Sequence, residues 1–252
     1  MSVVLYEVKD RVALIQLNRP DKLNAINAQM REELFGAFED VERNPDVWVA
    51  IITGNSKVFS VGHDLVQMAA GGVPGTRTTD ELYEYQLSIY KPIIAAIDGY
   101  CLAQGTGLAL CSDIRIMTSR AQFGWPQVKR GISSISGPTL LAHRVPLNIA
   151  LEILMTGEPI RAEQALRLNL VNRVVEPEAL LPTAYALAAQ INQNAPLAVR
   201  AMKEATLRAF NLPFPERVHL AREVSDRLIS TADHEEGLRA FNEKRKPVWT
   251  GR

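Results

Sequence analysis

The chain carries two glycine-containing bends, and each follows an apolar run typical of a buried strand. The first bend is Phe59-Ser60-Val61-Gly62-His63-Asp64, and the second is Asp98-Gly99-Tyr100-Cys101-Leu102-Ala103-Gln104-Gly105-Thr106-Gly107. Glycine lets backbone N–H groups approach a ligand without interference from a Cβ. Two such bends resemble the halves of an oxyanion hole, in which paired N–H donors hold a carbonyl oxygen that gains negative charge.

Hydrophobic periodicity predicts a mixed α/β first part of the chain and a helical second part. Val3–Val8 and Val12–Leu17 predict a hairpin, Asn27 caps a helix that runs to about Glu42, and another helix covers Asp80–Tyr90. Ala69–Thr79 predicts a mobile loop. Three nearly continuous apolar runs predict strands covered on both faces: Val47–Thr53, Pro92–Ile97 and Asp113–Thr118. After them come a helix from about Gly105 to Cys111, a short strand at Val171–Val175 and helices at Pro138–Arg144, Pro146–Met155, Ala162–Leu168, Glu178–Asn192 and Pro196–Phe210, with two more within Glu216–Glu243.

Composition excludes several classes of function. Lys+Arg and Asp+Glu both number 28 in 252 residues, so no overall field favours nucleic acid or an acidic membrane. No signal peptide or membrane-spanning run is apparent, and the two cysteines indicate a reduced, cytoplasmic protein without a disulfide framework. His143, His219 and His234 lack metal-ligand spacing, so we expect no metal site.

Six stretches, in order along nearly the whole chain, resemble the crotonase superfamily, that is, the enoyl-CoA hydratase/isomerase family. They are Leu17-Asn18-Arg19-Pro20-Asp21-Lys22-Leu23-Asn24-Ala25, Gly62-His63-Asp64, Gly99-Tyr100 through Asp113, Phe123-Gly124-Trp125-Pro126, Thr156-Gly157-Glu158-Pro159-Ile160 and Phe241-Asn242-Glu243-Lys244-Arg245-Lys246-Pro247. The resemblance implies a crotonase-type α/β spiral of ββα turns over residues 1–195. It also implies a helical C-terminal region over 196–252 that assembles homotrimers or dimers of trimers.

The same resemblance implies an acyl-CoA substrate, with coenzyme A as part of the substrate and no separate cofactor. The oxyanion donors would be the N–H groups of His63 and Gln104, each stabilising the enolate by roughly 3–4 kcal/mol. Coenzyme A would be contacted near the first turn and first bend, and by the C-terminal helix, often from a neighbouring subunit. The residues concerned are Lys22, Leu23, Ala25, Leu65, Phe241 and Lys244.

The chain departs from family members that add water at their two acid/base positions. A glutamate is expected at each, but Gly107 has no side chain and Gln127 cannot titrate. Neither residue can therefore supply the acid or base that ordinary hydration of an enoyl-CoA requires. Ser134 lies among serine hydroxyls that either hydrogen-bond loop backbone, the favoured interpretation, or take part in catalysis.

The role of His63 allows several alternative reactions. Gly-His-Asp at this bend resembles methylmalonyl-CoA-type decarboxylases, which make the enolate by losing CO2 and need no base, although their tyrosine is absent near Ser134. The alternatives are a decarboxylase or C–C hydrolase that uses His63, a site in which only the His63 backbone matters, and a non-catalytic acyl-CoA-binding protein.

Five further residues carry simpler expectations. Asp64 is expected to cap the turn after the first bend, and Asp98 to close a strand end. Trp125 either lines an acyl pocket or fills the core, and Cys101 and Cys111 are expected to be inert core thiols.

Overall fold

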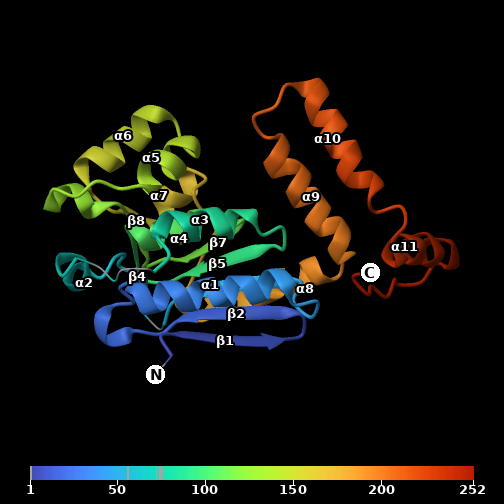
Figure 1. Cartoon of the computed structure of the whole chain (residues 1–252), viewed down its shortest axis with the longest axis horizontal. Coiled ribbons are helices and arrows are strands. Elements are labelled where there is room, and N and C mark those ends of the chain that lie inside the picture. The colour runs from blue at the N-terminus through green and yellow to red at the C-terminus, as the bar shows by residue number, and fades with distance from the viewer. Residues whose placement is uncertain (1, 56, 72, 74–75) are drawn as a thin grey trace.

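The computed structural model describes residues 2–55, 57–71, 73 and 76–252, and its centre is a six-stranded sheet (Figure 1). β1 and β2 form an antiparallel hairpin, and the other strands follow in parallel in the order β1-β2-β3-β5-β7-β10. Their bounds are β1 Val4–Lys9, β2 Val12–Leu17, β3 Val49–Thr53, β5 Ile93–Ile97, β7 Ile114–Thr118 and β10 Arg173–Val175.

A second sheet of four short strands has the order β4-β6-β8-β9. β4, β6 and β8 are parallel, and β9 pairs antiparallel with β8. The bounds are β4 Val58–Ser60, β6 Tyr100–Leu102, β8 Gln122–Gly124 and β9 Ile160–Arg161. These strands lie directly beside the two bends, since β4 enters the first bend and β6 lies within the second.

Helices cover both faces of the large sheet, which explains the apolar runs. On one face Ala50 and Ile52 of β3 join the core that includes Phe38 of α1, and on the other Val49 and Ile51 pack with Ala184 of α8. The helices of this part are α1 Ala28–Arg43, α2 Leu65–Ala69, α3 Thr79–Ser88, α4 Gln104–Leu110, α5 Ser136–Leu140, α6 Leu147–Thr156, α7 Ala162–Arg167 and α8 Leu180–Asn192. Short 3₁₀ turns lie at η1 Pro20–Lys22, η2 Pro126–Arg130, η3 Leu141–His143 and η4 Pro177–Ala179.

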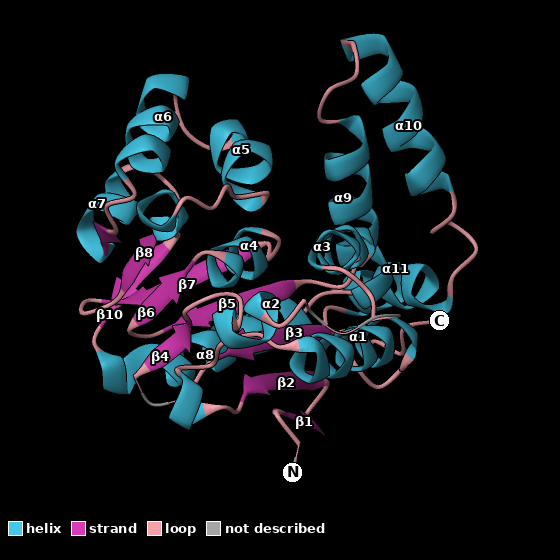
Figure 2. Ribbon diagram, turned by 60° about the vertical axis from the view of Figure 1, so that its left-hand side comes forward, coloured by secondary structure: helices cyan, strands magenta, loops and turns pink. Residues whose placement is uncertain are grey.

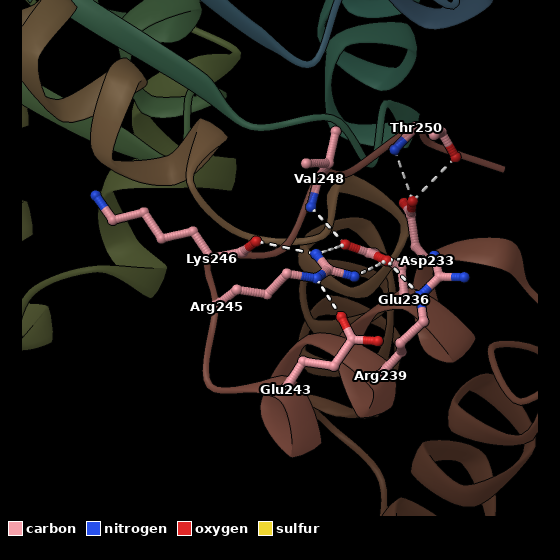
Figure 3. A network of polar contacts seen from close by, with 8 residues as sticks. All are labelled: Asp233, Glu236, Arg239, Glu243, Arg245, Lys246, Val248 and Thr250. Carbon is pink, nitrogen blue, oxygen red and sulfur yellow. Dashed lines mark hydrogen bonds and ion pairs between the residues drawn. The ribbon is translucent and has the colours of Figure 1, made fainter.

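Three C-terminal helices complete the chain: α9 Pro196–Ala209, α10 Phe214–Asp226 and α11 Ala232–Glu243. Figures 1 and 2 both show α9 and α10 side by side, projecting away from the sheets. The tail after α11 returns along that helix, where the Glu236 carboxylate accepts hydrogen bonds from Arg239, Arg245 and the N–H of Val248 (Figure 3). No helix among the described residues is both long and apolar enough to cross a membrane.

The structure confirms the predicted fold class and most of the elements. Asn27 caps α1 by accepting a hydrogen bond from the N–H of Met30 at 2.9 Å. The second sheet and α2 were not predicted, because strands of two or three residues are too short to show a period. The loop expected over Ala69–Thr79 includes Gly72, Pro74 and Gly75, which lie outside the described residues.

Candidate active site

The first bend is fixed by the segment that follows β2. The N–H of Ile26 donates to the carbonyl of Gly62 at 2.7 Å, and the N–H of Asp64 donates to the carbonyl of Ile26 at 3.1 Å. The Ser60 hydroxyl donates to the carbonyl of Asn24 at 2.7 Å. Ile26 thus bonds to both neighbours of His63, and the N–H of His63 itself has no acceptor among the described residues.

The second bend is fixed by an unusual backbone conformation at Ala103, which has φ 54° and ψ −114°. The N–H of Ala103 donates to Gly124 at 2.8 Å, and its carbonyl accepts from the Thr106 hydroxyl and from the N–H of Gly107. These bonds hold the peptide that carries the N–H of Gln104. Gln104 is the first residue of α4, so this N–H has no partner within the helix.

The two bends are in direct contact. A Cβ placed on Gly62 would stand 2.6 Å from the Cβ of Ala103 and 3.1 Å from the amide nitrogen of Gln104. Gly62 also has φ +96°, a conformation that L side chains rarely adopt. The glycine therefore brings the backbone N–H groups of His63 and Gln104 into one region.

A largely apolar cavity of about 700 Å³ opens beside this region. It is lined by nine residues for which the sequence predicted a role and by others from α2, α3 and η2. The nine are Lys22, Leu23, Ala25, His63, Asp64, Leu65, Gln104, Gln127 and Ser134. The structure thus brings the predicted coenzyme A residues of the first turn together with the bends.

Thr79 of α3 joins the side chains of the two bends. Its hydroxyl oxygen accepts a hydrogen bond from Nε2 of Gln104 at 2.9 Å and lies 3.4 Å from Nε2 of His63. The imidazole faces the cavity, yet the protein around it removes enough water to lower the pKa of His63, and the nearby charge of Arg31 lowers it further. Both effects favour the neutral form of the imidazole, and the nearby charge of Asp80 opposes them.

The two positions that lack acids have different surroundings. Gly107 is backed by Tyr83, because a Cβ at residue 107 would lie 2.7 Å from Cε1 of that ring and closer still to Cζ and the hydroxyl oxygen. Oε1 of Gln127 is buried without a partner among the described residues. The Ser134 hydroxyl accepts from the N–H of Gly137 at 3.1 Å, which agrees with the loop-backbone interpretation.

Comparison with known proteins now decides the family. A family model described as enoyl-CoA hydratase/isomerase matches residues 7–252. The chain belongs to the enoyl-CoA hydratase/isomerase family. It is 36% identical over 254 residues to a probable enoyl-CoA hydratase of Mycobacterium leprae, covering 100% of this chain and 99% of that one. It is 39% identical over 251 residues to a carnitinyl-CoA dehydratase of Citrobacter koseri, covering 94% of each.

Solved structures agree with this assignment. An enoyl-CoA hydratase from Mycobacterium tuberculosis H37Rv superposes with a TM-score of 0.93 at 36% identity, with 100% of both chains covered. The crotonase fold is therefore shown for this chain, and the chain is an enzyme of that family.

In this member of the enoyl-CoA hydratase/isomerase family, the two acidic residues of the bends make local contacts, and the two predicted C-terminal contacts lie outside the cavity. Asp64 caps α2 by accepting from the N–H groups of Val66 and Gln67, as predicted, and is paired with Arg19 at 3.0 Å. Asp98, at the end of β5, pairs with Arg120. Phe241 and Lys244 do not line the cavity of the single chain.

Burial decides between the two alternatives for Trp125 and agrees with the expectation for the two cysteines. Trp125 is 1% exposed, packs in the core and is not part of the cavity lining. Cys101 and Cys111 are buried, and burial raises the pKa of both thiols, as expected for inert cysteines. No cluster of three or more His, Cys, Asp or Glu that could hold a metal occurs within the part of the chain that the structure describes.

Sequence reasoning missed Thr79 and Tyr83, both on the buried face of α3. The signal that could have found them is their spacing of four residues, which places two polar side chains on the same inward face as Leu82 and Gln86.

Proposed function

We propose that this enzyme acts on an acyl-CoA thioester and holds the enolate oxygen at the N–H groups of His63 and Gln104. The observation that supports this most is the contact of the two bends through Gly62, beside an apolar cavity, where neither N–H group has an acceptor among the described residues. Two such donors are suited to a carbonyl oxygen that gains charge during reaction. Coenzyme A would enter as part of the substrate, along Lys22, Leu23, Ala25 and Leu65.

We further propose that ordinary hydration of enoyl-CoA is weak. Neither Gly107 nor Gln127 offers a group that can exchange a proton with water near neutral pH. The test is hydration of crotonyl-CoA followed at 25 °C. We expect turnover well below about 10 s⁻¹, a typical enzymatic rate, and a rate at or above it would contradict the proposal.

Decarboxylation is the second candidate, and the position of the His63 imidazole favours it. This side chain faces the cavity on the same bend as one proposed donor, and decarboxylation forms the enolate without a base. The test compares the wild type with His63→Ala on methylmalonyl-CoA, and unchanged turnover in the variant removes the imidazole from the reaction.

A panel of acyl-CoA thioesters analysed by mass spectrometry would identify the lyase or isomerase reaction. If calorimetry detects binding but no member of the panel is converted, the chain is an acyl-CoA-binding protein instead.

We also propose assembly into a trimer or a dimer of trimers through α9–α11. Large apolar side chains on these helices are exposed in the single chain, among them Met202, Phe210, Phe214 and Phe241 at 72%, 66%, 74% and 83%. Exposed apolar surface of this kind marks interaction sites. Light scattering measures the assembly directly, and a monomer at micromolar concentration would contradict it.

A further inference from the structure

The hydroxyl of Tyr83 fills the space that a side chain at residue 107 would need. A Cβ at that position would lie 2.7 Å from Cε1 of the ring and closer to Cζ and the hydroxyl oxygen. Residue 107 lies three positions after Gln104 on α4, so the two share one face of the helix. The phenol therefore stands next to Gln104, the residue whose N–H is one of the two proposed enolate donors.

Polar contacts hold the phenol in place at the cavity wall. Tyr83 is 6% exposed and lines the cavity, and its hydroxyl donates to the carbonyl of Gln104 at 3.1 Å. The Ser136 hydroxyl is close enough to influence the phenol, and it donates to the carbonyl of Ala103 at 3.5 Å and accepts from Nε1 of Trp125 at 3.0 Å.

We propose that Tyr83 is the catalytic acid of this site and that it protonates the α-carbon of the enolate. This inference rests on the proposed enolate site at His63 and Gln104. In the step, the O–H bond of Tyr83 breaks and its electron pair stays on the phenolic oxygen. The C=C pair of the enolate forms the new Cα–H bond, and the thioester C=O is restored. A proton from solvent then returns the phenolate to the neutral phenol.

Other titratable groups of the described cavity are less suited to the step. Asp64 is engaged with Arg19 and caps α2, and Lys22, Lys129 and Arg130 are exposed. His63 lies on the other bend, beside Thr79.

The surroundings of Tyr83 keep it in the acid form. Burial raises the pKa of this phenol well above its ordinary value, and Cys111, Asp80 and Cys101 add to the shift while Ser136 opposes it. A neutral phenol at pH 7 acts as an acid, and it acts as a base only in the small fraction that is ionised.

Hydrogen exchange at the α-carbon tests the proposal, since an acid that protonates the enolate must also remove that proton in reverse. The full-length protein is incubated with butanoyl-CoA in D2O, and deuterium uptake is followed by mass spectrometry. We expect the wild type to exchange faster than buffer and Tyr83→Phe to exchange about 100-fold more slowly than the wild type. Tyr85→Phe is the matched control, because that hydroxyl lies on the same helix and donates to Glu42 at 2.6 Å, outside the cavity.

A second probe separates failure of this inference from failure of the enolate site. Acetoacetyl-CoA ionises readily, and its bound enolate is detected by absorbance. If the wild type neither binds this enolate nor exchanges butanoyl-CoA, the enolate site and the role of Tyr83 are both overturned. If it binds the enolate but shows no exchange above buffer, or if Tyr83→Phe exchanges as fast as the wild type, only the role of Tyr83 is overturned.

The pH profile of the wild type decides the matter even if Tyr83→Phe does not fold. Exchange through a small ionised fraction of Tyr83 rises about tenfold per pH unit from pH 6 to 9. A profile that levels off near neutral pH would assign the proton transfer to His63 and overturn the proposal.

Discussion

Gly62 lies against Ala103 so closely that only a residue without a side chain fits. The Cβ of Ala103 and the amide nitrogen of Gln104 would be 2.6 Å and 3.1 Å from a Cβ on Gly62. The first bend is bonded to Ile26 and the second to Gly124, so neither can shift without breaking backbone hydrogen bonds. The spacing of the two bends therefore depends on this glycine.

We predict that Gly62→Ala lowers stability and weakens binding of acetoacetyl-CoA. The methyl group adds overpacking of about 1–3 kcal/mol to the strain of positive φ. Gly71→Ala is the control, because Gly71 has φ +87° and no atom of the described residues within 4 Å of the position that a Cβ would take, so we expect it to incur the backbone strain alone. Urea unfolding and calorimetry compare the two variants, and equal losses in both would contradict the role of the contact.

The sequence predicts the central strands because strands that are buried on both faces consist of nearly continuous apolar residues. Val49–Thr53 and Ile93–Ile97 are buried at every position, and such runs indicate strands covered on both faces. The second sheet leaves no such mark, because its strands have two or three residues. Its order is set by pairing between segments far apart in the chain.

The candidate site likewise has one part that the sequence could predict and one part that depends on tertiary packing. The residues of the bends and of the first turn could be chosen from local motifs, and they line one cavity. The relation between Tyr83 and Gly107 could not, because it depends on how α3 packs against α4. The roles given to Phe241 and Lys244 stay predictions, since they involve a neighbouring subunit.

We predict that His63 titrates below its ordinary pKa of about 6.5. Removal of water by the surrounding protein and the charge of Arg31 favour the neutral imidazole, while Asp80 opposes them. Since the folded-state pKa is lowered, the folded protein binds fewer protons than the unfolded chain near this pH. The stability linked to His63 is thus present above the unfolded pKa and is lost as pH falls.

NMR titration of the imidazole, assigned with His63→Gln, checks this prediction. Thr79→Val removes the hydroxyl beside Nε2 and serves as a second probe of the same environment. A His63 resonance that titrates at or above the ordinary pKa would show that the imidazole is not held neutral.

We predict that Glu236 holds the C-terminal tail against α11. Its carboxylate accepts from Arg245, from Arg239 and from the N–H of Val248 at 2.8 Å, as Figure 3 shows. Hydrogen bonds from these groups, first of all from Arg245, hold the pKa of Glu236 well below its usual range. The stabilisation is therefore present above the unfolded pKa of about 4.3 and is lost only as pH falls through the lower folded value.

Glu236→Gln should release the tail at neutral pH. We expect faster amide exchange at Val248 and altered fluorescence of Trp249, whose Nε1 donates to the carbonyl of Gln193 at 2.8 Å. Glu243→Gln is the control, since Glu243 is exposed and makes one ion pair with Arg245 at 2.6 Å, and it should have a smaller effect. Equal protection of Val248 in Glu236→Gln and the wild type would contradict the prediction.

We predict that Tyr83 and Gly107 are energetically coupled. Gly107→Ala in the wild type forces its methyl group against the Tyr83 ring and should lower the free energy of unfolding. In Tyr83→Ala the ring is gone and the same methyl group has room, so the cost should largely disappear. A double-mutant cycle by urea unfolding should then give a coupling of about 1–3 kcal/mol.

Gly36→Ala provides the control cycle with Tyr83→Ala. Gly36 is an exposed residue within α1, and no atom in the described part of the chain lies within 4 Å of its Cβ position, so alanine there should stabilise the helix by about 0.5–1 kcal/mol in both backgrounds. Additivity in this pair and coupling in the other would show that Tyr83 occupies the space of a side chain at residue 107. Additivity in both cycles would mean that the ring can move away from α4, and a fixed phenol beside Gln104 would then be excluded.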